Sequence, residues 1–269
     1  MGSLLIKNIK YLVTNDKESP LLKNVNLLIR DGVIEAIGGT DLAADEVVDA
    51  EKMLVYPGLI NAHHHLYQIF TRNLPKVQSM ELFDWLKTLY ELWKYLDDET
   101  VYFSSAVGMG ELLKTGCTCC FDHHYVFPEN QSARLIDTQF EAAKALGIRM
   151  HVSRGSMSLS KKDGGLPPDS VVQTTEEILC DSERLVNKFH DPKPYSMRSV
   201  ALAPCSPFSV TPELMKETAA LARKLGVRLH THLAETKDEE AYVREKYRMT
   251  PLELMESLDW LGSDVWYAH

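Results

Sequence analysis

Short apolar runs that alternate with turn residues make up the first 56 residues of the chain. The runs LLIKNIKYLV and NVNLLI indicate strands, and Asp31-Gly32 before VIEAIGG is a hairpin signal. These residues are therefore predicted to form a small all-β unit. Since they lack the partner strands that complete a sandwich, residues 1–56 are expected to be the N-terminal part of a composite β-sandwich domain.

From about residue 55 the pattern changes to short apolar strands that alternate with amphipathic helical stretches. The predicted strands are 53–60, 117–122, 148–153, 199–204, 227–232 and 264–269, and the predicted helices between them include 99–116, 133–147, 175–189 and 211–226. Three of these helices close on glycine in the manner of a C-cap, at Gly116, Gly147 and Gly226. This βαβ organisation is typical of a parallel sheet covered by helices.

The number of strands falls short of a closed barrel. A (β/α)₈ barrel needs eight strands, whereas this pattern supplies six and ends at His269, the last residue of the sixth. The fold class predicted for residues 57–269 is therefore α/β, a TIM-type barrel truncated after strand 6. A fragment of this kind would expose two sheet edges, so we expect the 269-residue chain alone to be inactive and to aggregate or oligomerise.

Two further segments belong to this second part. Residues 79–96 form a helix with apolar and aromatic residues too numerous for one narrow stripe, which fits core packing, a lid over a pocket or a dimer face. Residues 155–175 are a long loop rich in Gly and Pro directly after a strand, and in an α/β barrel such a loop lies over the active-site face.

Composition excludes several function classes. The chain has 45% hydrophobic and 25% charged residues, which describes a globular protein, and its net charge of −9 with scattered basic residues argues against nucleic acid as a partner. No stretch approaches the roughly 20 apolar residues of a membrane span. The N-terminus indicates a strand rather than a signal peptide, so a cytoplasmic location is predicted.

Five cysteines give no disulfide framework. The count is odd, and Cys117, Cys119 and Cys120 fall within four positions of one predicted strand. Cys117 and Cys120 form a CxxC, but no second CxxC or nearby pair of histidines completes a zinc site. We interpret them as buried thiols in preference to metal ligands or a redox pair.

Histidines gather at the ends of the predicted strands. Nine of the ten lie in or just past a strand, and only His190 does not. His63 and His65 are two positions apart, so strand alternation points both side chains into the barrel mouth, while His64 points away. Neutral imidazole suits zinc and iron, and His232, at the end of another strand, is the candidate third ligand. His230 lies one layer deeper and is expected to be a hydrogen-bond partner of a ligand.

Glu235 follows His232 by three residues. A carboxylate just past a metal-bound histidine lies within reach of a substrate above the metal and can move a proton. The alternative is a surface salt bridge, because the following residues, TKDEEAYVREK, indicate a solvated helix.

The motifs together resemble the amidohydrolase superfamily. They are PGLINAHHHLYQ (57–68), CFDHHYVFP (120–128), HVSRGSMS (151–158), GGLPPDSVV (164–172), LAPCSPFSV (202–210), HTHLAE (230–235) and VWYAH (265–269). Within the superfamily they are similar to the cytosine deaminase and chlorohydrolase-like branch, and most of all to bacterial 8-oxoguanine deaminases and hydroxyatrazine ethylaminohydrolases. The resemblance implies a metal-dependent hydrolase barrel over residues 57–269 that forms a homo-oligomer when full length.

The resemblance also implies roles for individual residues. His63, His65 and His232 would be metal ligands, Glu235 the proton shuttle and His269 the group that orients the water or polarises the leaving centre. The residues expected to face the substrate are Gln68, His123 and Arg154. The family's remaining ligand, an aspartate at the eighth strand, has no counterpart here. Relatives with two metals use a carboxylated lysine at the fourth strand, where this chain has Ala203-Pro204-Cys205, so a single Zn²⁺ or, alternatively, iron is expected.

The implied reaction is hydrolytic deamination of an amino-substituted N-heterocycle with water as co-substrate. The resemblance implies 8-oxoguanine first, with hydroxy-s-triazines or guanine-type rings as alternatives. The alternative outside the enzymes is that the chain is an inactive fragment or a metal-binding interaction module.

Overall fold

The computed structural model describes residues 2–129, 131 and 133–269, and the chain divides into two compact units. One unit comprises the chain up to Leu59 together with Lys193–Tyr195, and the other comprises Ile60–Pro192 and Ser196–His269. The division near residue 60 lies a few residues after the boundary expected at 56/57. Each unit is described on its own below.

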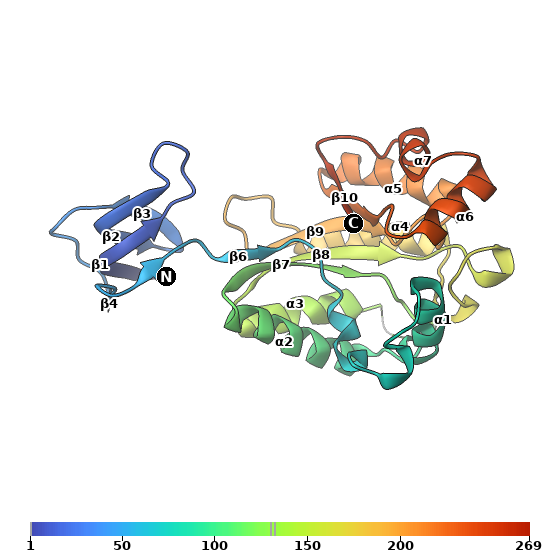
Figure 1. Ribbon diagram of the computed structural model, residues 1–269, viewed down its shortest axis with the longest axis horizontal. Helices are drawn as coiled ribbons and strands as arrows, with labels where there is room; N and C mark the ends of the chain where they lie inside the picture. The colour runs from blue at the N-terminus through green and yellow to red at the C-terminus, as the bar shows by residue number, and fades with distance from the viewer. Residues whose placement is uncertain (1, 130, 132) are drawn as a thin grey trace. The chain divides into compact units, whose positions relative to one another are not determined.

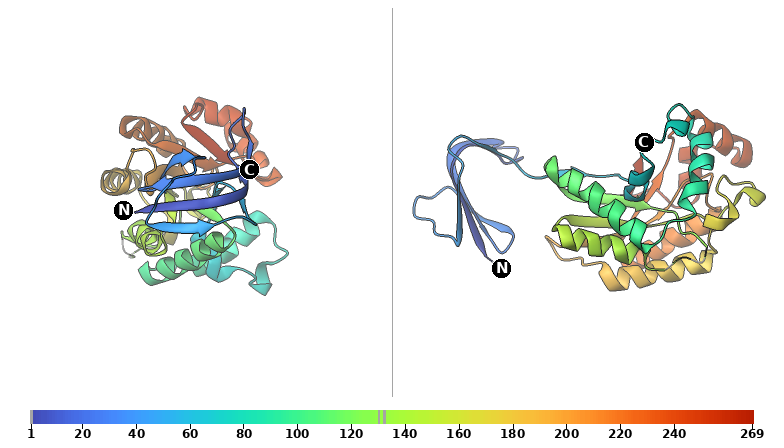
Figure 2. Two further views of the ribbon diagram at one scale, coloured as in Figure 1. Left: turned by 90° about the vertical axis from the view of Figure 1, so that its left-hand side faces the viewer. Right: turned by 90° about the horizontal axis from the view of Figure 1, so that it is seen from below.

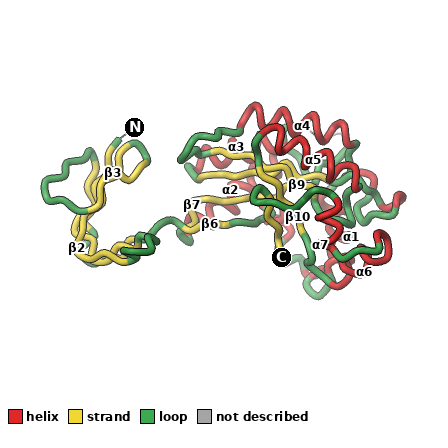
Figure 3. The backbone as a smooth tube through the Cα atoms, turned by 90° about the horizontal axis from the view of Figure 1, so that it is seen from above, coloured by secondary structure: helices red, strands yellow, loops and turns green. Residues whose placement is uncertain are grey.

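The first unit is a sheet of five strands. They are β1(Ser3–Val13), β2(Leu21–Arg30), β3(Val33–Ile37), β4(Glu46–Asp49) and β5(Leu54–Val55). The sheet has the order β3-β2-β1-β4, with β5 also paired to β1. Asp31 and Gly32 both have positive φ, of 52° and 81°, as the turn between β2 and β3 requires. Figure 3 shows this unit as strands and loops.

The second unit contains a six-stranded sheet. Its strands are β6(Leu59–Asn61), β7(Cys117–His124), β8(Arg149–Ser156), β9(Arg198–Pro204), β10(Arg228–His232) and β11(Val265–Ala268). They lie in the order β11-β10-β9-β8-β7-β6, so the sheet follows the chain strand by strand. The pairs from β7 to β11 are parallel, which confirms the predicted parallel sheet.

Helices connect these strands. The α-helices are α1(Leu82–Trp93), α2(Asp98–Lys114), α3(Leu135–Leu146), α4(Thr175–Phe189), α5(Pro212–Leu225), α6(Lys237–Tyr247) and α7(Pro251–Ser257). Short 3₁₀ turns lie at η1(Leu66–Thr71), η2(Pro75–Val77), η3(Lys161–Asp163) and η4(Asp169–Val171). Helices α2 to α5 pack against β7 to β10, as Figures 1 and 2 show. Over the described residues, no helix combines the length and hydropathy needed to cross a bilayer.

One predicted strand is wrong. Residues 53–60 do not form a single strand, because the chain leaves the extended ladder between Val55 and Leu59. Pro57 has no N–H to donate, and Gly58 follows it, so the stretch splits into β5 in the first sheet and β6 in the second. The other strand predictions hold within a few residues; β7 and β8 run on to His124 and Ser156.

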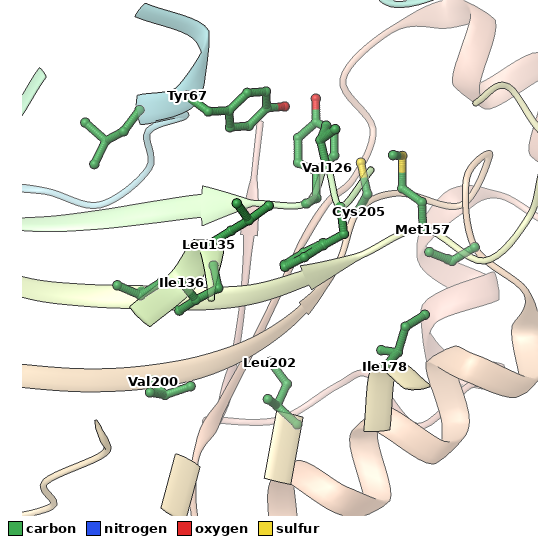
Figure 4. Packing of buried hydrophobic residues seen from close by; sticks show 14 of the residues in the cluster. Tyr67, Val126, Leu135, Ile136, Met157, Ile178, Val200, Leu202 and Cys205 are labelled. Atoms are coloured by element: carbon green, nitrogen blue, oxygen red, sulfur yellow. The ribbon is translucent and has the colours of Figure 1, made fainter. Parts of the chain in front are cut away.

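Strand alternation divides the sheet into two faces. Val200 and Leu202 of β9 are fully buried against helix side chains such as Ile178 of α4, in the cluster that Figure 4 shows in part. Residues of the opposite phase, such as His123 and His230, form the other face. Alternate residues along a strand therefore face either the helices or the histidines of the other face.

Candidate metal centre

The carboxyl ends of the strands bring the imidazoles together. His63 and His65 follow β6, His123 lies near the end of β7, His232 closes β10 and His269 follows β11. Since parallel strands end at the same edge of a sheet, side chains far apart in the sequence meet there. The ring centroids of His63, His65 and His232 lie 4.7 to 5.0 Å from one another.

Backbone carbonyls fix the tautomers of His65 and His232. Nδ1 of His65 lies 2.7 Å from the carbonyl oxygen of His123, and Nδ1 of His232 lies 2.7 Å from that of Cys205. A carbonyl only accepts, so both Nδ1 atoms carry the proton and both Nε2 atoms carry a lone pair. These two Nε2 atoms are 3.1 Å apart, an arrangement of facing lone pairs that a cation between or beside them would stabilise.

A chain of two imidazoles fixes His63. Nδ1 of His230 donates to the carbonyl oxygen of Trp266 at 2.9 Å, which leaves its Nε2 to accept from Nδ1 of His63 at 3.0 Å. Nε2 of His63 is then an acceptor that is buried and has no hydrogen-bond partner among the described residues. His230 thus takes the predicted place of a hydrogen-bond partner, and Nε2 of His63, like those of His65 and His232, carries a lone pair.

Burial keeps these imidazoles neutral. Desolvation, and then the neighbouring histidines, lower the pKa of His63 to about 4 and that of His232 to about 3. The same causes lower the pKa of His65 well below its ordinary value. A neutral imidazole is the form that binds a metal, so the site is in its binding form at neutral pH.

Donor atoms close enough to share an ion form three groups among the described residues. The groups are His63, His232 and His269; His65, His123 and His232; and His63, His123 and His230. Each of the first two contains two of the three predicted ligands, and His232 belongs to both. The nitrogen donors and the unpartnered Nε2 of His63 fit a divalent ion that prefers imidazole.

Glu235 and His269 lie beside this cluster. Oε1 of Glu235 is 3.7 Å from Nε2 of His269, and the His269 ring stacks on that of His232 with centroids 5.7 Å apart. Burial raises the pKa of the Glu235 carboxyl, so it holds a proton more readily than an exposed glutamate. A carboxyl with a raised pKa is suited to taking up and releasing a proton during a reaction.

A cavity of about 580 Å³ opens onto the imidazoles. It is lined by His63, His65, Gln68, Val77, Gln78, Met80, Leu82, Trp85, Leu86, Tyr125, Cys205, Phe208, His232, Glu235 and His269. The segment predicted as a core, lid or dimer helix supplies one apolar wall through Leu82, Trp85 and Leu86, while Leu89 and Trp93 of the same helix are buried in the core. Gln68 lies at the cavity as expected, and its Nε2 donates to the hydroxyl of Tyr67 at 3.3 Å.

The structure places two predicted substrate contacts elsewhere. His123 is buried within the imidazole cluster, where its Nε2 donates to the carbonyl oxygen of Ala203, and it does not line the cavity. Arg154 lies on the helix-facing side of β8, because it is three positions from the inward-facing His151. It forms an ion pair with Asp181 at 2.7 Å and stacks on Phe127, so a substrate contact does not fit its position.

Sequence reasoning gave no site role to Asp122 and used Cys205 only as evidence against a second metal. Oδ1 of Asp122 accepts from the N–H of Leu66 at 2.6 Å, next to His65, and Oδ2 accepts from Nε2 of Gln139 at 2.7 Å. Asp122 comes directly before His123 in β7 and binds the segment that carries His65, but in the sequence it looked like an ordinary strand residue. Cys205 lines the cavity and is buried, which raises the pKa of its thiol to about 12. Its strand-end position was the available signal.

Comparison with known proteins now decides the family. The family model described as the Amidohydrolase family matches residues 54–269. The chain belongs to the amidohydrolase family. This amidohydrolase is 45% identical to 8-oxoguanine deaminase of Pseudomonas aeruginosa over 247 residues, which are 90% of this chain and 55% of that protein. It is 39% identical to hydroxydechloroatrazine ethylaminohydrolase of Pseudomonas sp. strain ADP, over all of this chain and 58% of that protein.

Solved structures agree with this placement of the amidohydrolase. The zinc complex of atrazine chlorohydrolase TrzN from Arthrobacter aurescens TC1 has a TM-score of 0.93 and 31% identity, covering 99% of this chain and 60% of that one. The amidohydrolase chain thus spans between half and two thirds of the length of the relatives it matches.

Proposed function

We propose that the protein carrying this chain is a metal-dependent hydrolytic deaminase that releases ammonia from an amino-substituted N-heterocycle, with 8-oxoguanine as the first candidate substrate. The observation that carries the proposal is the cluster of histidine donor atoms at the carboxyl edge of the sheet, in which His232 shares one donor group with His63 and another with His65, beside a carboxyl of raised pKa at Glu235. The similarity to a protein named 8-oxoguanine deaminase supports the substrate.

The metal would be one divalent ion, with zinc ahead of iron, held by His63, His65 and His232. Zinc bound there supplies a water nucleophile at neutral pH. A second ion bridged by a carboxylated lysine finds no counterpart in this chain, because Cys205 follows β9 and its thiol stays protonated with a pKa of about 12. The relative TrzN, whose crystal contains zinc, favours zinc over iron.

Glu235 would move the proton. Its carboxylate accepts a proton from the attacking water and delivers it to the ring nitrogen next to the carbon that carries the amino group. The water oxygen forms a bond to that carbon, and the second proton of the water passes to the amino nitrogen. The bond from carbon to the amino nitrogen then breaks, ammonia leaves, and the carbon keeps the water oxygen as a carbonyl. His269, whose Nε2 lies 3.7 Å from Oε1 of Glu235, would orient the water or polarise the leaving centre.

Substrate contacts would come from the cavity walls. Because Tyr67 accepts one N–H of the Gln68 amide, the other groups of this amide are available to hydrogen-bond the edge of a planar ring. Hydroxy-s-triazines are the second candidate, since a relative of comparable similarity is named hydroxydechloroatrazine ethylaminohydrolase. Both ring types carry the amino-substituted carbon that this chemistry requires.

The test is an ammonia-release assay on the zinc-loaded protein, expressed from its whole gene, with 8-oxoguanine, guanine and a hydroxylated aminotriazine. We expect release with at least one ring and, in Glu235→Gln, a fall in kcat of at least about 100-fold with zinc retained. Glu240→Gln is the matched control, because Glu240 is exposed and pairs only with Arg244 on the same helix among the described residues. Full zinc occupancy without release from any ring would favour a metal-binding module instead.

Two further predictions concern the protein as a whole. We expect a homo-oligomer, which size-exclusion chromatography with light scattering measures, and a small heterocycle with water as the only reactants. Activity of the 269-residue chain by itself would contradict the expectation that it is inactive.

A further inference from the structure

The three residues that follow His232 have their backbone amides fixed one after another. The N–H of Leu233 donates to the carbonyl oxygen of Ala268 in β11 at 3.1 Å. The N–H of Ala234 donates to Oε1 of Glu239 at 3.0 Å, and the N–H of Glu235 donates to Oε2 of the same side chain at 2.9 Å. One carboxylate thus accepts two consecutive amides, including that of the proposed proton shuttle.

Glu239 is at a common capping position of a helix but accepts hydrogen bonds from unusual partners. It is the third residue of α6, whose N-cap is Thr236. In α4 and α7 the glutamate at the same position, Glu177 or Glu253, returns to the N–H of its own N-cap and closes a capping box. Glu239 reaches back past its N-cap to the two preceding residues.

The contact between Glu239 and these amides has two unfavourable terms, the burial of a carboxylate and a strained backbone. Its side chain is fully buried, whereas an ordinary capping glutamate stays in water. Ala234 has φ of +59°, a left-handed conformation that is strained for a residue with a Cβ. Two hydrogen bonds to a charged acceptor offset this cost, and the start of α6 favours a negative charge.

The carboxylate of Glu235 receives less support. The polar contact described for it is Nε2 of His269, and 3.7 Å exceeds a hydrogen-bond distance. Its position therefore depends on its backbone. We propose that Glu239 is a positioning residue that fixes the backbone of Ala234 and Glu235, and through it the distance from the Glu235 carboxyl to the imidazole cluster. The proposal rests on the proposed function only where it assigns proton transfer to Glu235.

The substitution Glu239→Gln tests the clamp. An amide keeps one acceptor oxygen but turns N–H groups toward one of the two backbone donors. We expect faster hydrogen exchange at the amides of Ala234 and Glu235, and kcat lowered by about 10- to 100-fold with KM and zinc content unchanged. Glu239→Asp keeps the charge but is too short to accept both bonds, and we expect it to behave in the same direction if Glu239→Gln does not fold.

Glu253→Gln is the matched control, since it changes the same residue type at the same position of α7, where the bonds go to Thr250. Its exchange at 234 and 235 and its kcat should equal those of the wild type. Wild-type exchange at both amides in Glu239→Gln would overturn the proposal, as would a loss of kcat that follows loss of zinc. If the wild type turns over no heterocycle, the proposed function fails, while amide exchange still decides the clamp.

Discussion

Replacing His230 with leucine should weaken zinc binding although His230 is not a proposed ligand. The substitution removes the acceptor of the His63 Nδ1 proton and the donor to Trp266, while it keeps an apolar side chain of similar volume. A buried N–H left without a partner costs about 1 to 3 kcal/mol. At about 1.4 kcal/mol per factor of ten, zinc affinity should fall by about 5- to 150-fold.

The assay is a competition titration of the folded apoprotein with zinc and a chromophoric chelator, with circular dichroism to confirm that the fold persists. His151→Leu serves as the control, because His151 is a half-buried imidazole that contacts the same Phe121 and Trp266 rings but belongs to none of the donor groups. Zinc affinity within twofold of wild type in His230→Leu would refute the idea that a hydrogen-bonded tautomer of His63 prepares the site.

Two further predictions concern stability. Burial raises the pKa of Asp122 to about 7 from its ordinary 3.8, so between these pH values the native state holds a proton that the unfolded chain has lost. Relative to Asp122→Asn, the wild type should therefore lose roughly 4 kcal/mol of unfolding free energy between pH 4 and 7 and little more above pH 7. Urea titrations at each pH measure this difference. A pH-independent difference would contradict this. Gly155→Ala should be destabilised by more than about 3 kcal/mol, since its Cβ would lie 2.1 Å from the backbone oxygen of His124 in the paired strand β7. In thermal melts its Tm should be well below that of Gly147→Ala, whose Cβ would meet no atom within 4 Å. Equal Tm values for the two variants would show that the paired strands yield to the added methyl group.

Much of the site followed from where histidines lie relative to strand ends. His63, His65 and His232 are distant in sequence, yet parallel strands share one carboxyl edge, so their meeting could be predicted from apolar periodicity alone. Arg154 shows the limit of that reasoning. A strand side chain three positions from His151 faces the opposite side, but β8 had to be known to extend through residue 154 before the alternation could be applied.

Other features depend on geometry that no local pattern encodes. Thr236 and Glu239 have the spacing of a capping box, but the carboxylate reaches Ala234 because of the left-handed φ at that residue. The tautomer of His63 depends on a contact with His230 across 167 positions. Pro57 was a readable signal, since a residue without an N–H rarely continues a central strand.

The carbonyl oxygens that hold His65 and His232 belong to the ends of neighbouring strands, so the cage for the cation is assembled by the sheet and not by the ion. Stripping the metal with a chelator should leave a folded apoprotein, unlike a zinc finger, whose structure collapses without its ion. We expect such a protein to release its ion and take it up again while the sheet stays folded.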